Sequence, residues 1–416
     1  MKLTVISYGT EGDNRPIVAL CRGLQSSGHD VVFLGERSIE TLATSSGVPF
    51  GALEGDMRAA VMPGGPLNRM MNERTHPGEM AKACADLTNK YTTSWMRSLL
   101  DVAQDSDGII FSGFAGYLAL SVAEYLNKPV MGAGLFPVSP TKEFPSSLIP
   151  PTRFPGFLNH ISHKVMMGVL WHLFRGSIND ARKEVCSQSA RWRAWNDYPI
   201  AYGISPSLLS QPKDWPEKWK ICGAWYQPDN SWEPTQELKD FLEAGKPPIY
   251  IGFGSMSGFD SNKLLEAIMP TLKSNRVIYA PGWSEYDASF LPSETLIIDN
   301  TPHDWLFPRV SLVIHHGGAG TCHAAAKAGT PSIVIPFAGD QFFWAHRLSQ
   351  LGIAPQPRPM LKIDAKGFKS MFQVAISEKM ANNSQALSLR MAHEDGVGSA
   401  VKHIEHSFIG NTKSNN

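Results

Sequence analysis

The residues best equipped for chemistry lie at positions 315–321, which read HHGGAGT. Glycines let a backbone approach a ligand closely, and the N–H groups and dipole of a helix that begins there attract an anion. A histidine beside them would add a charge-assisted hydrogen bond. The segment therefore predicts a binding site for a phosphate or a diphosphate.

Of the two histidines, His316 is the better candidate for anion binding. Neighbouring residues of a strand point to opposite faces, and His316 is the one that adjoins the glycines. The residues alone leave two alternatives open. The glycines could simply end a buried strand, or His315, His316 and His323 could bind a metal, although no carboxylate stands at a usual ligand spacing.

A second Gly-rich turn, at residues 9–16, reads GTEGDNRP. Asp13 in this turn could act as a general base, or it could be the N-cap of the helix that follows, for which Asp is among the best residues. Nicotinamide binding is a weaker alternative, with Glu36 as the ribose-binding acid. The glycines at 252–258 miss the GxGxxG spacing by one residue, and the first turn lacks the middle glycine.

The elements that must position these residues are short β-branched runs that alternate with helical stretches, a pattern typical of parallel α/β units. Each half of the chain opens with a strand, a Gly-rich turn and a helix. We therefore predict an α/β protein with two doubly wound parallel-sheet domains that face a central crevice, where such sheets bind ligands. The predicted strands are 3–8, 30–34, 48–53, 108–111 and 130–134 in the first half, and 249–253, 276–280, 295–299, 311–315 and 332–336 in the second.

The length of 416 residues also favours two domains, since domains commonly contain roughly 100–200 residues. We predict an N-terminal domain at 1–225, a linker at 226–236, a C-terminal domain at 237–409 and a disordered tail at 410–416. The proline-rich stretch 141–160 predicts a long irregular loop, and such loops are commonly functional.

Charge and composition exclude several classes of protein. Lys and Arg together number 38, as do Asp and Glu, which argues against nucleic acid or an anionic membrane as the main partner. The five cysteines form no CxxC pair, so a disulfide framework or a zinc ribbon is not expected. We find neither a secretory signal nor an apolar run of the ~20 residues that span a bilayer, and we expect a cytoplasmic protein.

The C-terminal half resembles a known enzyme family. Residues 302–348, PHDWLFPRVSLVIHHGGAGTCHAAAKAGTPSIVIPFAGDQFFWAHRL, are similar to the nucleotide-sugar signature of the family 1 glycosyltransferases. Within that family they are most similar to the sterol glucosyltransferase branch and its macrolide and glycopeptide relatives. Residues 249–256, the Gly282-Trp283 pair and residues 9–16 match the same family in the same order along the chain.

This resemblance implies a GT-B fold and an inverting transfer that needs neither a metal nor a cofactor. It also implies a nucleotide-sugar-binding C-terminal domain at 237–409, which mainly holds a UDP-sugar donor, and an acceptor-binding N-terminal domain at 1–225. The implied site residues are Asp13 as the base; Ser255, His316, Gly318, Gly320 and Thr321 at the diphosphate; Trp283, Pro302 and His303 at the uracil; and Asp340 and Gln341 at the sugar hydroxyls.

The sequence departs from the family pattern at two places, one beside the candidate base Asp13 and one at the position that binds the ribose in plant members. Glu11, Asn14 and Arg15 stand where the family usually has Arg, an apolar residue and Gln. Ala324 stands where the plant members of the family carry a ribose-binding Glu.

The acceptor is expected to be apolar. The stretch 153–175 is rich in Met and aromatic residues, and it could wall an apolar pocket, contact a membrane surface or be plain core. The candidate acceptor contacts are Phe144, Met167, Trp171 and Phe174.

We therefore expect transfer of glucose from UDP-glucose to the hydroxyl of a hydrophobic acceptor, above all a sterol. A macrolide, a polyketide or a flavonoid is the alternative acceptor, and a TDP-sugar the alternative donor. A nucleotide-sugar epimerase is disfavoured by the aromatic 141–175 region, and a non-catalytic nucleotide-sugar sensor by the presence of a candidate base.

Overall fold

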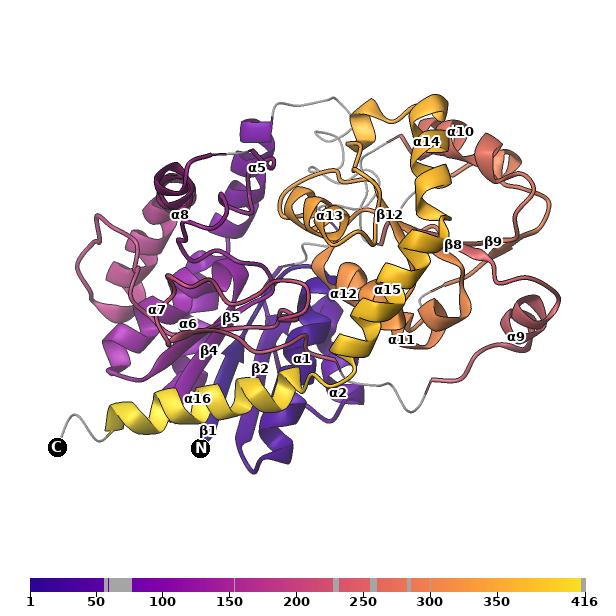
Figure 1. The fold of residues 1–416 in the computed structure, drawn as a ribbon. Helices are drawn as coiled ribbons and strands as arrows, with labels where there is room; N and C mark the ends of the chain where they lie inside the picture. Colours follow the sequence, from indigo (N-terminus) through magenta and orange to yellow (C-terminus); the bar gives the residue numbers. More distant parts are fainter. Residues whose placement is uncertain are drawn as a thin grey trace.

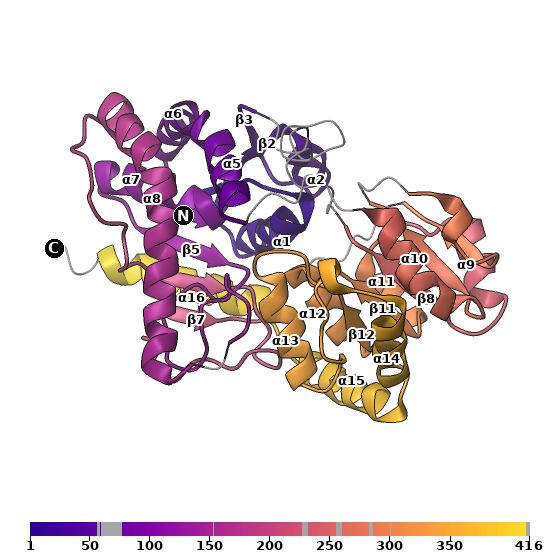
Figure 2. The same ribbon diagram turned by 90° about the horizontal axis from the view of Figure 1, so that it is seen from above.

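Two α/β units with parallel sheets lie side by side in the computed structural model (Figure 1, Figure 2). It describes residues 1–55, 59, 77–152, 154–226, 232–254, 260–282, 286–299 and 301–412. Each of the strands predicted from the sequence is present, with ends shifted by a few residues at most.

The first sheet has seven parallel strands among the described residues, in the order β3-β2-β1-β4-β5-β6-β7. The order reverses between β1 and β4, which is the switch point where doubly wound sheets bind ligands. The strands are β1 (Lys2–Ile6), β2 (Asp30–Glu36), β3 (Phe50–Leu53), β4 (Gly108–Ser112), β5 (Val130–Gly134), β6 (Ile200–Tyr202) and β7 (Trp219–Ile221).

The second sheet has five parallel strands in the described part of the chain, in the order β10-β9-β8-β11-β12. His315 at the end of β11 pairs in register with Gly252 at the end of β8, so both strands reach the switch point together. The strands are β8 (Ile249–Gly252), β9 (Val277–Ala280), β10 (Thr295–Ile297), β11 (Leu312–His315) and β12 (Ser332–Val334).

Helices cover both faces of the first sheet, which explains why its strands are apolar almost throughout. Side chains alternate along β1: Val5 packs in the core beneath α1, and Ile6 packs in the core beneath α6 and α7. The helices are α1 (Glu11–Ser26), α2 (Glu40–Ser45), α5 (Pro77–Asn89), α6 (Thr92–Ala103), α7 (Gly116–Leu126) and α8 (Gly156–Cys186).

The second sheet is covered in the same way. Its two cores lie beneath α10 and α14 on one face and beneath α9, α11 and α12 on the other. The helices are α9 (Gln236–Glu243), α10 (Ser261–Leu272), α11 (His303–Leu306), α12 (Ala319–Ala328), α13 (Gln341–Gln350), α14 (Ala365–Ala375) and α15 (Glu378–Met391). Short 3-10 turns are Arg37–Ile39, Gly113–Ala115, Ala288–Phe290, Phe307–Arg309 and Met360–Lys362.

The last helix, α16 (Gly396–Thr412), returns to the first domain and lies along its sheet (Figure 1). Ile404 and Phe408 of α16 are buried in the core of the first sheet. The sequence-based limits were therefore wrong at this end of the chain. The second domain does not include all of 237–409, and the helix continues through residues 410–412 of the predicted tail. Residues 413–416 and, within the predicted linker, 227–231 lie outside the described residues.

A shared apolar cluster joins the two domains. Tyr202 and Trp215 of the first domain pack in the same buried cluster as Trp344 and Leu348 of α13. The chain crosses between the domains where Gly223 meets Gly396: a Cβ on Gly223, whose φ is +111°, would lie 2.6 Å from the Cα of Gly396. The domains are therefore in direct apolar contact and are not joined by a linker alone.

The predicted irregular loop lies between β5 and α8, which begins after Pro155. Residues 156–175 of the aromatic stretch are part of α8, a helix of 31 residues along the outer side of the first domain (Figure 2). Among the described residues, no helix combines the length and apolarity needed to span a bilayer.

Candidate functional site

The turns after β1 and β11 come together at the boundary between the domains. The helix α1, which follows β1, contacts α12, which follows β11. Asp13 in α1 and Asp340 just before α13 lie close enough for their charges to interact. The structure thus brings the predicted base and one predicted sugar ligand to one place, although they are 327 positions apart.

Asp13 is held by the first turn of its own helix. The backbone N–H and the hydroxyl of Thr10 donate hydrogen bonds of 2.9 and 2.8 Å to Asp13 Oδ2. The N-cap is Thr10, so the alternative that Asp13 is the N-cap was wrong. Asp13 is the third residue of the helix, and together with Thr10 it forms a capping box. Among the described residues Oδ1 makes no hydrogen bond, and this oxygen can therefore accept a proton.

Gly9 allows this close approach. Its φ is +127°, a conformation that glycine adopts without strain, and an added Cβ would lie 2.9 Å from Asp13 Oδ2. Asp13 remains accessible to water, but the surrounding protein partly desolvates the carboxylate and raises its pKa, while the Thr10 hydrogen bonds oppose the rise. A carboxylate with a raised pKa is a better proton acceptor than an ordinary aspartate.

Asp340 is a second carboxylate with a raised pKa. Burial, followed by the negative charge of Asp13, raises its pKa to about 7, against the opposing hydrogen bond from Trp344. The Trp344 indole N–H donates to Asp340 Oδ2 over 3.1 Å, which fixes the side chain at the start of α13. Asp340 is therefore oriented by the second domain and titrates near neutral pH.

Gln341, the other predicted sugar ligand, is turned toward its own loop. Its Oε1 accepts hydrogen bonds from the N–H groups of Phe337 and Ala338, at 2.8 and 3.1 Å. The amide oxygen therefore shapes the turn that presents Asp340. A contact between the Gln341 amide nitrogen and sugar hydroxyls stays a prediction.

His316 lies against the start of α12. A Cβ on Gly318, the N-cap, would lie 2.6 Å from His316 Nε2, so the absence of a side chain at position 318 permits the contact. A Cβ on Gly320 would meet no atom within 4 Å, and Thr321 is half-buried in the same turn. The site thus combines open space, a helix N-terminus without a side-chain cap and an imidazole.

The electrostatic state of His316 suits a ligand that brings negative charge. Its Nδ1 is buried without a hydrogen-bond partner among the described residues. Burial lowers the pKa of His316 to about 4, so the imidazole is neutral at neutral pH in the free protein. A phosphate beside it would favour the protonated form, because a nearby opposite charge stabilises an imidazolium.

The other two histidines of the metal alternative do not join His316. His315 is fully buried at the end of β11, and its Nδ1 accepts a hydrogen bond of 3.1 Å from the Gly317 N–H. His323 links the domains: its Nε2 accepts from the Ser205 N–H at 3.1 Å, and its Nδ1–H donates to the Ala319 carbonyl at 2.7 Å. The three rings therefore have different partners and different structural roles.

The predicted uracil contacts are described in part. Pro302 is the N-cap of α11, and His303 is its first residue. The His303 ring stacks on Phe307, with centroids 4.3 Å apart, and its Nε2 lies 3.5 Å from the Tyr250 hydroxyl. Burial, and then the positive charge of Arg15, lowers the pKa of His303 to about 4. Ser255 and Trp283 lie outside the described residues.

Two neighbours of the site were not predicted from the sequence. Arg15 of α1 lies close enough to the second domain for its positive charge to lower the pKa of His303. It also forms an ion pair with Glu11. Thr10 orients the candidate base. The departures at positions 11 and 15 from the family pattern were a signal for Arg15, and the Thr10–Asp13 spacing was a signal for a capping box.

The predicted acceptor contacts separate into two groups. Phe144 packs on Phe343 of the second domain, with ring centroids 5.4 Å apart, and Met167 is half-buried on α8. Trp171 and Phe174 are buried in the core beneath α7 and α8. Their expected contact with an acceptor was therefore wrong in this structure, where the core-packing alternative holds.

Phe114 is a better acceptor candidate that the sequence did not reveal. It follows β4 at the switch point, on the same edge of the sheet as Asp13, and it is 42% exposed. Its ring stacks on Phe174, with centroids 5.1 Å apart, which holds it in place. Tyr8, which follows β1, is half-buried near the same edge, 4.6 Å from the Trp95 ring.

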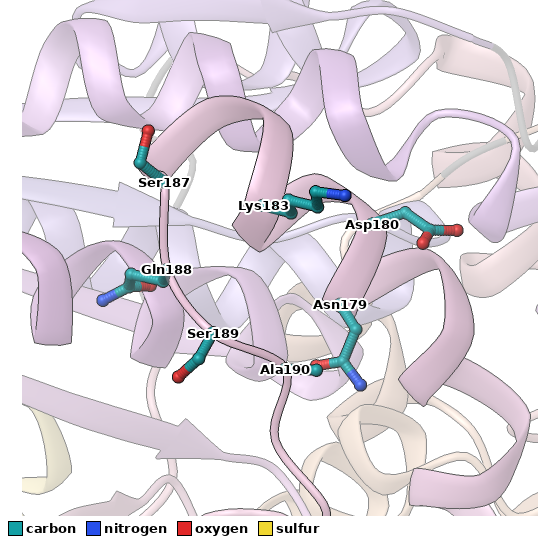
Figure 3. Close-up of a pocket in the computed structure, with 7 residues that line it drawn as sticks. All are labelled: Asn179, Asp180, Lys183, Ser187, Gln188, Ser189 and Ala190. Atoms are coloured by element: carbon teal, nitrogen blue, oxygen red, sulfur yellow. The ribbon is translucent and has the colours of Figure 1, made fainter.

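A separate hollow of about 660 Å3 lies at the C-terminal end of α8 (Figure 3). Six of the seven residues that line it have polar side chains, among them Asp180, Lys183 and Gln188. This end of α8 packs near Glu124 at the end of α7, and α7 runs away from the switch point toward the opposite edge of the sheet. An acceptor in this hollow would therefore not reach Asp13.

Comparison with protein families and curated proteins identifies relatives of this chain. The family model for the C-terminal domain of erythromycin biosynthesis protein CIII-like proteins matches residues 264–402. Two sterol 3-beta-glucosyltransferases of Arabidopsis thaliana are 32% and 31% identical over 97% and 96% of this chain, which covers 65% and 67% of their lengths. A sterol 3-beta-glucosyltransferase of Aspergillus fumigatus is 32% identical over 97% of the chain, which covers 30% of that protein.

Solved structures confirm the predicted fold. The kitacinnamycin glycotransferase has a TM-score of 0.72 at 16% identity, with 98% of both chains covered. A glycosyltransferase of Streptomyces sp. SF2575, complexed with thymidine diphosphate, has a TM-score of 0.61 at 16% identity, with 98% of this chain and 99% of that chain covered. The GT-B fold therefore extends over nearly the whole chain.

Proposed function

The chain belongs to the glycosyltransferase family that includes the sterol 3-beta-glucosyltransferases, and on this premise we propose that it transfers glucose from UDP-glucose to the hydroxyl of a sterol. The observation that carries the proposal is the identity of 31% with a plant sterol 3-beta-glucosyltransferase across 96% of this chain. The chain spans about two thirds of the length of the plant relatives and under a third of the fungal one.

The donor diphosphate binds at the start of α12. The N–H groups of the first turn and the helix dipole face its negative charge, and the free space at Gly320 admits it. His316 gains a proton as the diphosphate enters and donates a hydrogen bond from its ring. These groups stabilise the charge that develops on the departing UDP, and we propose that no metal or cofactor takes part.

The acceptor hydroxyl meets Asp13 from the first domain. Asp13 Oδ1 takes the hydroxyl proton while the acceptor oxygen forms a bond to the anomeric carbon, and the bond from that carbon to the diphosphate oxygen breaks. Attack on the side opposite the leaving group inverts the anomeric configuration. Asp340, oriented by Trp344, accepts hydrogen bonds from sugar hydroxyls and fixes the glucose between the two sites.

We expect an apolar acceptor because the aromatic side chains of Phe114 and Tyr8 lie at the edge of the first sheet beside Asp13. Burial of apolar area stabilises a complex by about 25 cal/mol per Å2, so a rigid ring system can bind tightly with a single hydroxyl to orient it. A cytoplasmic location stays a prediction.

The test is an incubation of the purified protein with UDP-glucose or a TDP-sugar and a panel of sterols, macrolides, flavonoids and hydrophilic alcohols. We expect steryl glucoside from UDP-glucose, at a rate that EDTA does not lower. Activity on macrolides with a TDP-sugar alone would favour the natural-product alternative, and a metal requirement would contradict the role proposed for α12. Release of glucose without transfer would contradict the acceptor site.

A further inference from the structure

The outward face of α8 carries an unpartnered apolar stripe. Phe157, Ile161, Val165 and Val169 recur at every fourth residue and therefore share one side of the helix. Their exposed fractions are 62%, 46%, 58% and 49%. Phe154 and Leu158 widen the stripe at its N-terminal end, at 38% and 37% exposed.

The same face continues toward a basic and aromatic end. One further turn along are His172, which is exposed, and Arg175, whose guanidinium lies 5.8 Å from the centroid of the Trp192 ring. Trp192 is 85% exposed. Lys164 is exposed beside the apolar residues. An apolar stripe with basic and aromatic residues at its border has the composition of a helix that lies in a membrane interface.

The local charge contrasts with the neutral chain. Residues 144–179 contain three Lys or Arg residues and no Asp or Glu, whereas the whole chain has 38 of each class. A contact between two copies through a two-fold axis would place the apolar stripe and its basic neighbours against the same residues of the second copy. Residues 144–179 contain no carboxylate that could pair with these basic side chains. An anionic lipid surface offers both the apolar phase and the negative charge.

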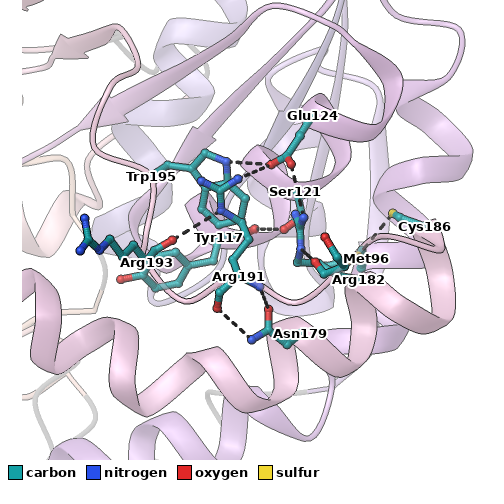
Figure 4. Close-up of polar contacts among 11 residues, drawn as sticks. Met96, Tyr117, Ser121, Glu124, Asn179, Arg182, Cys186, Arg191, Arg193 and Trp195 are labelled. Carbon is teal, nitrogen blue, oxygen red and sulfur yellow. Dashed lines mark hydrogen bonds and ion pairs between the residues drawn. The ribbon is translucent and has the colours of Figure 1, made fainter.

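The helix is fixed firmly enough to present this face. Its C-terminal end is tied to the loop that follows: Asn179 exchanges two hydrogen bonds with the backbone of Arg191, of 2.8 and 3.1 Å. Arg182 is buried and pairs with Glu124, which also accepts from the Trp195 indole N–H (Figure 4). The inner face of the C-terminal half of α8 is core. In the N-terminal half, Asn159 and His163 are buried and donate hydrogen bonds to the carbonyl groups of Lys142 and Phe144, so the stripe cannot turn inward without breaking these contacts.

We propose that the stripe on the N-terminal half of α8 binds the surface of an anionic lipid bilayer. The stripe begins directly after the loop that leaves the carboxyl end of β5, on the edge of the sheet where Asp13 lies. Docking there places the acceptor side of the site against the phase in which apolar alcohols dissolve. Lipid binding itself requires neither donor nor acceptor, so it can be tested separately from glycosyl transfer.

The test is flotation of the full-length protein with vesicles of phosphatidylcholine, or of phosphatidylcholine mixed with phosphatidylglycerol. We expect the protein to float with the mixed vesicles. The triple variant Phe157→Ser, Ile161→Ser, Val165→Ser is expected to lose at least about tenfold in partition, because three inserted side chains are removed. Lys164→Glu is expected to weaken binding to the mixed vesicles and to leave the small partition into neutral vesicles unchanged.

The matched control is the double variant Leu361→Ser, Leu389→Ser, which removes side chains that are 77% and 70% exposed in the second domain. It should float like the wild type, and all variants should keep the wild-type thermal midpoint and UDP affinity. The proposal is overturned if the wild type stays in the aqueous fraction, or if the control variant loses as much as the triple variant. A dimer that the triple variant dissociates, without vesicle binding, would assign the stripe to self-association instead.

Discussion

Asp13 and Asp340 stand on different domains, yet the charge of Asp13 acts on Asp340 and, after burial, is the second cause that raises its pKa to about 7. The two carboxylates therefore cannot both be fully ionised at neutral pH in the free protein. A donor whose hydroxyls hydrogen-bond to Asp340 binds the ionised form more tightly, because a carboxylate is a stronger acceptor than a carboxylic acid, whereas the base needs Asp13 without a proton. The pair couples donor binding to the protonation of the base.

Donor binding should follow the ionisation of Asp340. We expect the affinity for UDP-glucose, relative to that for UDP, to rise as the pH passes upward through about 7. Asp13→Asn removes the second cause of the raised pKa and should move this rise to lower pH. Titration calorimetry of both ligands at several pH values on each side of neutrality measures the difference. Parallel curves for UDP and UDP-glucose would show that Asp340 does not touch the sugar.

The stability of the free protein should also depend on Asp340. Its folded pKa of about 7 lies above the ordinary value of 3.8, so the folded state keeps a proton that the unfolded chain releases. The stabilising contribution is fully present below the ordinary pKa and is lost as the pH rises through about 7. Asp340→Asn should flatten this part of the curve of thermal midpoint against pH. An unchanged slope would contradict the raised pKa.

The adjacent histidines should behave differently on substitution. His316→Ala removes a charge-assisted hydrogen bond to the diphosphate and should weaken UDP binding by about ten- to a hundredfold. His315→Ala empties a fully buried position at the end of β11 and should lower the thermal midpoint with little effect on UDP affinity. Calorimetry and thermal unfolding of both variants separate the two roles. Equal losses of UDP affinity would contradict the assignment.

Phe114 and Trp171 form a second matched pair. Phe114→Ala removes an exposed ring at the switch-point edge and should raise the KM for the acceptor several-fold, with the KM for UDP-glucose unchanged. Trp171→Ala empties a buried position and should cost about 3–5 kcal/mol of unfolding free energy. If Trp171→Ala raised the KM for the acceptor without lowering stability, and Phe114→Ala did not raise it, the acceptor would contact α8 instead.

The sequence predicted the parts of the fold that depend on local pattern. Short apolar runs bounded by Gly-rich turns located β1 and β11, and through them the switch points that carry Asp13 and His316. The strands β6 and β7 escaped prediction because each has three residues and because no helix separates them, so the alternation of strands and helices does not mark them. The return of α16 to the first sheet depends on tertiary packing that no local pattern specifies.

The site residues were predicted through a family resemblance, but the geometry of the site could not be predicted from the sequence. Alternation along the strand predicted different roles for the adjacent histidines: His315 is fully buried at the end of β11, and His316 follows the strand and lies against Gly318. Anion binding by His316 stays a prediction. The position of Asp13 within the capping box depends on the hydroxyl of Thr10, and the engagement of Gln341 depends on a loop conformation. The effect of Arg15 on His303 joins two domains, so only the folded chain reveals it.

The most direct test of the proposed reaction is steryl glucoside formation by the wild type and by Asp13→Asn, with UDP-glucose as donor and the anomeric linkage determined by NMR. We expect a β-linked steryl glucoside from the wild type and a loss of turnover of roughly 10²–10⁴-fold in Asp13→Asn, with UDP affinity nearly unchanged, because the variant retains the fold and lacks the base. Retention of more than about half of the turnover by Asp13→Asn, or an α-linked product, would contradict Asp13 as the base of an inverting transfer.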